Sequence, residues 1–245
     1  MASKKIQFYP IDLSYKIENE KPVIYIFGRL TGGEQICVID RNFQPYFWVM
    51  SEDTHSFIEK AKKLEIETKQ GFARVVSADL VKKKYLGNEI EMVKVTVNMP
   101  SAVPALREVI KGWEFVKSVN EADILFVRRY LIDKGITPLT LAEAEGEFVN
   151  LKSKVPVFEA ASVKQFSDDS IKNPNIVAID IETYNPAGKS ALVPEKNPII
   201  MIALYSKNFQ KVITWKRFKT DKNYIEFVKS EDELTFCISS LNILF

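Results

Sequence analysis

Short apolar runs recur through the first 135 residues of the chain, separated by turn-forming residues. The runs are rich in β-branched and aromatic residues, a composition typical of short strands. Gly-Gly and an Asn-containing segment separate the first runs, and the turn Leu86-Gly87-Asn88 joins the last two. The predicted strands are residues 22–30, 34–40, 45–50, 73–81 and 89–98.

Two other segments of this region have helical periodicity. Residues 52–64 repeat apolar side chains at helical spacing, with Ser51 as the expected N-cap. A shorter helix is predicted over residues 103–110, where Pro100-Ser101 opens it. Short helices among short strands predict an α+β fold for residues 1–135, which form the first predicted domain.

After this domain the pattern changes twice. Residues 136–174 have weak periodicity and end in polar turn formers, so they are predicted to be a connector. The following stretch, residues 175–245, contains a capping box at Ser230 and Glu233, which predicts a helix. Its predicted strands are residues 175–185, 197–206 and 211–218. Three strands and a helix that ends on apolar residues bury little surface, so we expect this second domain to be cut short.

Composition narrows the protein class only broadly. The 245 residues are 46% hydrophobic and 27% charged, with a net charge of +2, as in an ordinary globular protein. The sequence contains neither an 18-residue apolar run nor a signal peptide, so we expect a cytoplasmic protein without membrane contact. Cys37, Cys237 and His55 lack the spacing of a zinc site and are expected to be core or surface residues.

The stretch from Asn175 to Asn185 contains two closely spaced carboxylates. It places Asp180 and Glu182 in a strand that is otherwise apolar and is expected to be buried. Because side chains alternate along a strand, both carboxylates would point to the same face. Two carboxylates side by side repel each other unless they share a proton or a cation. The pair therefore indicates a candidate cation site.

Asp-Ile-Glu-Thr after an apolar strand resembles the opening motif of the DnaQ-like 3′–5′ exonucleases. With its flanking residues, it is similar to the start of the proofreading domain in archaeal family B DNA polymerases. Four earlier segments resemble the N-terminal domain of that family, in the same order and at similar spacing. The five segments are residues 40–50, 82–90, 100–107, 129–136 and 177–185. The resemblance implies an α+β N-terminal domain of mixed strands and short helices, followed by a truncated RNase H-like (DnaQ-type) α/β exonuclease domain.

The resemblance also implies a role for the carboxylate pair. In the family, the corresponding residues bind two divalent cations, Mg²⁺ or Mn²⁺, for phosphodiester hydrolysis. Asp180 and Glu182 match these ligands, with Asp180 expected to bridge the metals. The closing residues Asn242–Phe245 resemble the second motif of the family, but its aspartate would be the next residue. We therefore expect an incomplete catalytic site with weak metal binding or none.

The N-terminal domain of the archaeal family binds single-stranded template and recognises uracil. The resemblance assigns Tyr46 as the steric gate against the thymine methyl group, with Pro45 fixing its backbone. Arg107 and Arg129 are expected to hold phosphate or brace the pocket. The residues matched to the family's uracil pocket are Tyr15, Pro45, Tyr46, Val103, Arg107, Ile124, Phe126 and Arg129.

Three interpretations of function remain open from the sequence. The chain is a DNA-binding fragment that recognises uracil without polymerase activity of its own, since the palm, fingers and thumb of the family are absent from it. Alternatively, it is a subunit of a split polymerase, in which a second chain supplies the rest of the 3′–5′ exonuclease site. The third interpretation is an inert truncated remnant. The segment with which the family completes its N-terminal domain is also absent, so we expect a less stable domain.

Overall fold

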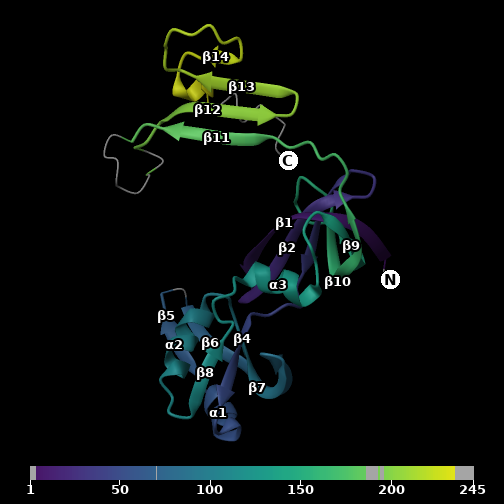
Figure 1. Cartoon of the computed structure of the whole chain (residues 1–245), viewed down its shortest axis with the longest axis vertical. Helices are drawn as coiled ribbons and strands as arrows, with labels where there is room; N and C mark the ends of the chain where they lie inside the picture. Colours follow the sequence, from purple (N-terminus) through teal and green to yellow (C-terminus); the bar gives the residue numbers. More distant parts are fainter. Residues whose placement is uncertain (1–3, 70, 186–192, 194–195, 235–245) are drawn as a thin grey trace. The chain divides into compact units, whose positions relative to one another are not determined.

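The computed structural model describes residues 4–69, 71–185, 193 and 196–234 (Figure 1). The chain forms two compact units, Met1–Ile171 and Lys172–Phe245, and each is treated by itself below. Within the described residues, no helix is long and apolar enough to cross a membrane. Cys237, the Asn242–Phe245 motif and most of the predicted C-terminal helix lie outside the described residues.

The first unit contains a closed barrel. Its strands lie in the order β1-β2-β3-β10-β9. They span Lys4–Glu18 (β1), Lys21–Leu30 (β2), Gln35–Asp40 (β3), Thr140–Val149 (β9) and Val157–Ser170 (β10). The long β1 pairs with both β2 and β9, and its register with β2 shifts at Pro10, which has no N–H to donate. Large apolar side chains fill the interior, among them Phe8, Ile24, Ile26 and Phe158.

A five-stranded sheet forms the other part of this unit, in the order β5-β6-β7-β4-β8. Its strands span Tyr46–Ser51 (β4), Glu65–Thr68 (β5), Gly71–Tyr85 (β6), Asn88–Val97 (β7) and Val116–Asn120 (β8). Helices α1 (Thr54–Ala61) and α2 (Ala102–Lys111) pack against it (Figure 1). Because side chains alternate along β4, Phe47 and Val49 face the helices, whereas Tyr46 and Trp48 belong to the barrel-side core.

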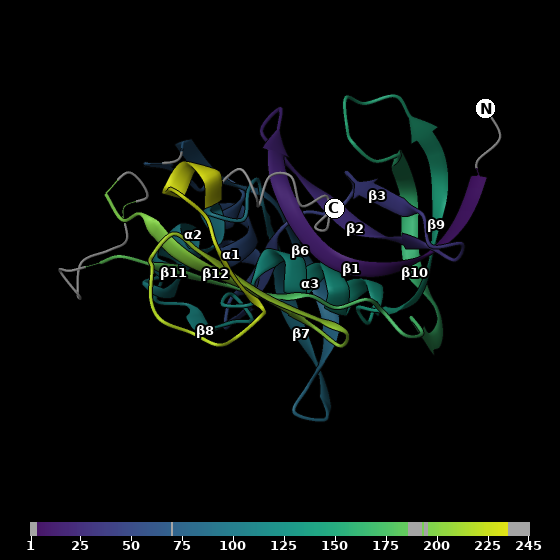
Figure 2. The ribbon, with the colours of Figure 1, turned by 90° about the horizontal axis from the view of Figure 1, so that it is seen from above.

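Helix α3, Phe126–Lys134, lies against the barrel, beside β1 (Figure 2). Its central Tyr130 is fully buried and donates a hydrogen bond of 2.9 Å to Asp40 at the end of β3. Lys134 forms an ion pair of 3.4 Å with the same carboxylate. Gly135 ends the helix with a φ of 62°, a left-handed conformation that glycine adopts without steric cost. The helix is thus fixed to the barrel through one buried carboxylate.

The second unit is a four-stranded sheet in the order β11-β12-β13-β14. The strands span Ala178–Thr183 (β11), Ile199–Ser206 (β12), Phe209–Thr214 (β13) and Ile225–Phe227 (β14). Its buried cluster is Ile202, Leu204, Ile213, Val228 and Leu234. One bond of the predicted capping box is present, because Ser230 Oγ accepts from the Glu233 amide at 3.3 Å. The Glu233 carboxylate accepts from the amide of the preceding residue, Lys229, at 2.6 Å, and not from that of Ser230.

Most sequence-predicted strands form where expected, although the N-cap of α1 is not Ser51. Ser51 is the last residue of β4, and its hydroxyl donates to the carbonyl of Phe115. Asp53 is the N-cap, and its carboxylate accepts a hydrogen bond of 3.0 Å from the Ser56 amide. Because Ser51 belongs to β4, it lies too early to cap the helix, and the next residue with a suitable side chain, Asp53, is the N-cap.

The structure also differs from the predicted connector at residues 136–174. This stretch contributes β9 and β10 to the barrel, and the first compact unit extends to Ile171. In β9 the buried positions include Ala142 and Ala144, which alternate with glutamates. Alanine carries little hydrophobic signal, and therefore the period of two is weak in the sequence.

Candidate functional site

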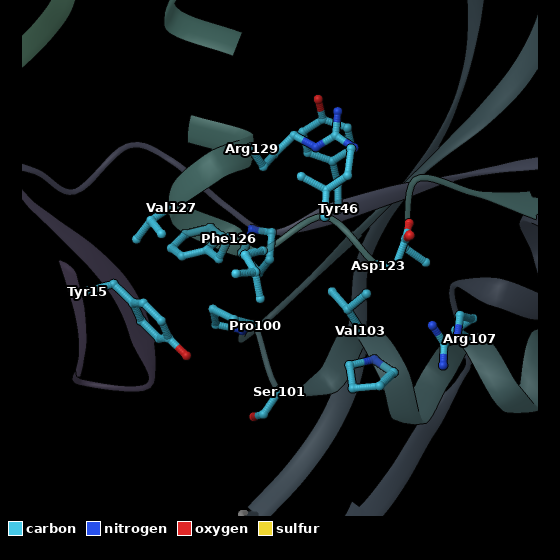
Figure 3. A pocket seen from close by; sticks show the side chains of 15 residues that line it. Tyr15, Tyr46, Pro100, Ser101, Val103, Arg107, Asp123, Phe126, Val127 and Arg129 are labelled. Atoms are coloured by element: carbon cyan, nitrogen blue, oxygen red, sulfur yellow. The ribbon is translucent and has the colours of Figure 1, made fainter. Parts of the chain in front are cut away.

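A pocket of about 490 Å³ lies in the first unit, between β1, the start of β4, the start of α2 and the segment that leads into α3 (Figure 3). Four distant stretches of the chain meet here. All eight residues assigned to the pocket from the sequence line it: Tyr15, Pro45, Tyr46, Val103, Arg107, Ile124, Phe126 and Arg129. The structure therefore brings the whole predicted set together around one cavity.

The walls of the pocket are rigid and largely apolar. Phe126, the first residue of α3, is mostly buried and makes an edge-to-face contact with Tyr15 at 5.3 Å between ring centres. The carbonyl of Pro45, another lining residue, accepts a hydrogen bond of 2.9 Å from the Val97 amide, which ties the start of β4 to β7. Pro100 and Pro104 add further surface without backbone donors. Aromatic and proline side chains thus make up much of the lining.

Tyr46 is held by its hydroxyl outside the cavity. The hydroxyl donates to both carboxylate oxygens of Asp133, at 2.9 and 2.7 Å. Burial and this hydrogen bond raise the pKa of the Tyr46 phenol well above its usual range. In Figure 3 the side chain of Tyr46 extends away from Val103 and Pro100. Tyr46 thus borders the pocket with its backbone and the near end of its side chain.

The two pocket arginines are in different environments. The Arg129 side chain is only 6% exposed and forms an ion pair of 2.7 Å with Glu121. Its guanidinium also lies 4.9 Å from the ring centre of Tyr46. Arg107 is 28% exposed, and its ion pair of 2.8 Å is with the adjacent, more exposed Glu108. Exposed pairs of this kind are weak, so the ion pair of Arg107 restrains its side chain less than the buried ion pair restrains Arg129.

Several lining residues were missed by sequence reasoning. Asp123 and Leu125 precede α3, line the pocket and are exposed. Glu121 and Asp133 do not line the pocket, but they contact residues that do. Glu121 forms the ion pair with Arg129, and Asp133 accepts the hydrogen bond from the Tyr46 hydroxyl. No periodicity marks residues 121–125, which are an irregular segment. The remaining lining residues that the sequence did not single out for the pocket are Pro100, Ser101, Pro104, Ala122 and Val127.

The carboxylate pair lies in the second unit, on β11. Asp180 and Glu182 occupy alternate positions opposite Ala203 and Met201 of β12, so they share one face of the strand as expected. The strand is not buried, however: both carboxylates are exposed, and Ile181 between them is 49% exposed. β11 is also an edge strand of the described sheet.

Two carboxylates are suitable ligands for Mg²⁺ or Mn²⁺, which are commonly held by one or two carboxylates together with phosphate and water. The donor type thus fits a divalent cation. Across residues 4–69, 71–185, 193 and 196–234, no group of three or more His, Cys, Asp or Glu side chains could hold a metal ion. Asp180 and Glu182 alone would make up only part of a coordination shell.

Comparison with known proteins gives the family. A sequence model described as DNA polymerase family B, exonuclease domain, matches residues 117–242, slightly more than half of the chain. The chain belongs to DNA polymerase family B. It is 37% identical to a DNA polymerase of Pyrococcus glycovorans and 36% identical to one of Thermococcus gorgonarius, in each case over 91% of this chain and 24% of the relative. The predicted family membership is confirmed.

A solved structure agrees with this placement. The family B DNA polymerase from the hyperthermophilic archaeon Pyrobaculum calidifontis matches 96% of this chain and 29% of that one, with a TM-score of 0.68 and 23% identity. This family B chain thus shares the fold of that polymerase's matching region and spans about a quarter of the length of its relatives. The exonuclease domains of the family use divalent metal ions.

Proposed function

We propose that the first unit binds single-stranded template DNA and holds one base in the pocket, selecting uracil over thymine. The chain by itself does not polymerise DNA. One observation carries the proposal: the eight residues assigned from the sequence come from four distant stretches and line a single cavity. Their convergence on one cavity supports the proposal.

The physical task of the pocket is to accept uracil and reject a base that carries one additional methyl group. The volume of about 490 Å³ lies within the usual range for small-molecule sites. A methyl group is excluded only by walls that cannot yield, and Pro45, Pro100 and Phe126 provide such walls. Discrimination by one methyl group is worth roughly 10- to 200-fold in affinity. Arg107 at the pocket is placed to contact a backbone phosphate.

The test is the affinity of the chain for two oligonucleotides that differ by one uracil or thymine, measured by fluorescence anisotropy at moderate salt. We expect uracil to bind roughly 10- to 200-fold more tightly. Val103→Gln should remove the preference, because the longer side chain fills the cavity. Val109→Gln makes the same change on the exposed side of α2 and should keep the preference. Equal affinity for the two strands in the unmodified, folded protein would refute the proposal.

A second candidate function concerns Asp180 and Glu182. The family match covers both residues, and their shared face on β11 suits one part of a two-metal 3′–5′ exonuclease site. In this proposal a second chain supplies the remaining ligands and the polymerase core. Mixing the chain with candidate partner fragments should then produce Mn²⁺-dependent digestion that Asp180→Asn abolishes. Digestion unchanged by that substitution would reject the role, and an inert remnant would show neither digestion nor uracil preference.

A further inference from the structure

Tyr46 is restrained by Arg129, which lines the pocket, and by three residues that do not: Asp133, Lys94 and Trp48. Its hydroxyl is bonded to Asp133, near the end of α3, 87 residues further along the chain. Its ring lies between two cations, with Lys94 at 4.0 Å and Arg129 at 4.9 Å from the ring centre. Trp48 contacts the ring edge-to-face at 5.7 Å. The side chain is therefore restrained along its length.

A chain of charges stabilises this arrangement. Arg129 is held by Glu121 at 2.7 Å, and Glu121 is also paired with Lys83 at 2.5 Å. Arg129 and Asp133 lie one turn apart on α3 at 4.0 Å. Desolvation opposes ionisation of Glu121, but its hydrogen bonds to Lys83 and Arg129 prevail and lower its pKa. The carboxylate that orients Arg129 is thus itself ionised and anchored at neutral pH.

The Asp133–Tyr46 hydrogen bond joins two elements that both contribute lining residues to the pocket. Tyr46 begins β4, with Pro45 directly before it, and Asp133 lies on α3, whose first residue is Phe126. The spacing of β4 and α3 therefore contributes to the space available to a base. A fraction of an ångström decides whether a methyl group fits, so a bond that fixes this spacing acts on selectivity more than on affinity.

We propose that Asp133 is a positioning residue for base selection: by accepting the Tyr46 hydroxyl bond, it fixes the start of β4 against α3 and so sets the width of the pocket. The inference rests on the proposed function. Asp133 is not among the lining residues of the pocket, and its effect reaches the base only through Tyr46. Since its side chain is 26% exposed, water can replace a lost partner, and the unit tolerates substitution here.

The experiment measures the uracil-over-thymine affinity ratio for Tyr46→Phe, Asp133→Ala and the double variant. Each single variant should lower the ratio roughly 3- to 10-fold, the effect of losing one partly buried hydrogen bond. The double variant should lower it no further, because both changes remove the same bond. Asp133→Asn keeps an acceptor oxygen at the same place and should retain most of the ratio. Affinity for the thymine strand should not fall in any of them.

The matched control is Tyr25→Phe. It also removes a tyrosine hydroxyl that is bonded to a carboxylate, Glu18, but away from the pocket, and the ratio should not change. If the wild-type ratio is large and Asp133→Ala leaves it intact, the positioning role is wrong while the proposed function stands. If the single effects add in the double variant, the two residues act separately, which also refutes the role. A wild-type ratio near one overturns the proposed function, and the positioning role with it.

Discussion

Gly146 on β9 offers a sharp test of how the barrel closes. A Cβ atom at this position would lie 2.0 Å from the carbonyl oxygen of Glu159 on β10, far inside the 3.4 Å at which ordinary contact begins. The next nearest atoms are the Ala160 Cα and the Glu159 carbonyl carbon, each at 2.9 Å. All three atoms belong to the backbone, so no side-chain rotation relieves the clash. Gly146→Ala must push β9 and β10 apart near residue 160, where their register already shifts.

We expect Gly146→Ala to lower the free energy of unfolding of the first unit by about 1–3 kcal/mol, the usual cost of overpacking a closed structure. With a urea dependence of ~2 kcal/mol per M, the unfolding midpoint falls by roughly 1 M. Tryptophan fluorescence in a Trp215→Phe background reports the first unit alone, since Trp48 and Trp113 both lie within it.

The control is Gly112→Ala at the end of α2. Its Cβ would meet only the Val109 carbonyl oxygen, at 3.4 Å, and its φ of −80° suits alanine. This substitution should leave stability unchanged or raise it by about 0.4–1 kcal/mol, through a smaller entropy of the unfolded chain. An unchanged midpoint for Gly146→Ala would show that β9 and β10 do not close the barrel as described.

Two further predictions concern activity and chemical reactivity. With Mg²⁺ or Mn²⁺, the purified chain should neither extend a primer nor digest single strands from the 3′ end. Robust digestion that is lost in Asp180→Ala would show that other carboxylates complete the site. Burial raises the pKa of the Cys37 thiol to about 11, so its thiolate is scarce at pH 8. Alkylation of the peptide that carries Cys37 should therefore be slow until urea unfolds the protein. Rapid labelling of the folded protein would contradict this burial.

The sequence predicts a strand well when the composition of that strand alone is typical of β-structure. Strands β2, β3 and β4 are dense in β-branched and aromatic residues and form within one residue of the expected bounds at each end. In contrast, several core positions of β9 are alanines, whose hydrophobic signal is weak, and β1 is interrupted by Pro10. The bounds of such strands follow from their partners in the barrel, which local periodicity does not contain.

The pocket likewise has residues that could be assigned from the sequence and residues that could not. Its lining could be assigned from the sequence because the resemblance places each residue in a recognisable segment. Its support could not, since Asp133 and Glu121 act on Tyr46 and Arg129 only through contacts made in the folded state. The carboxylate pair was placed correctly on one face of a strand, but its exposure depends on which strands lie beside β11, and a single strand does not encode its neighbours.

The path of the chain through the barrel limits how this protein can be divided. The chain leaves the barrel after β3, builds the five-stranded sheet and its helices, and re-enters at β9, so the sheet is nested inside the barrel's own sequence. A fragment that ends at residue 135 would keep every pocket residue but would lose the strands that pair with β1 and β3. Two strand edges would then be open to pairing between molecules, a frequent cause of insoluble expression. The smallest sensible unit for recombinant work on the pocket therefore extends to Ile171.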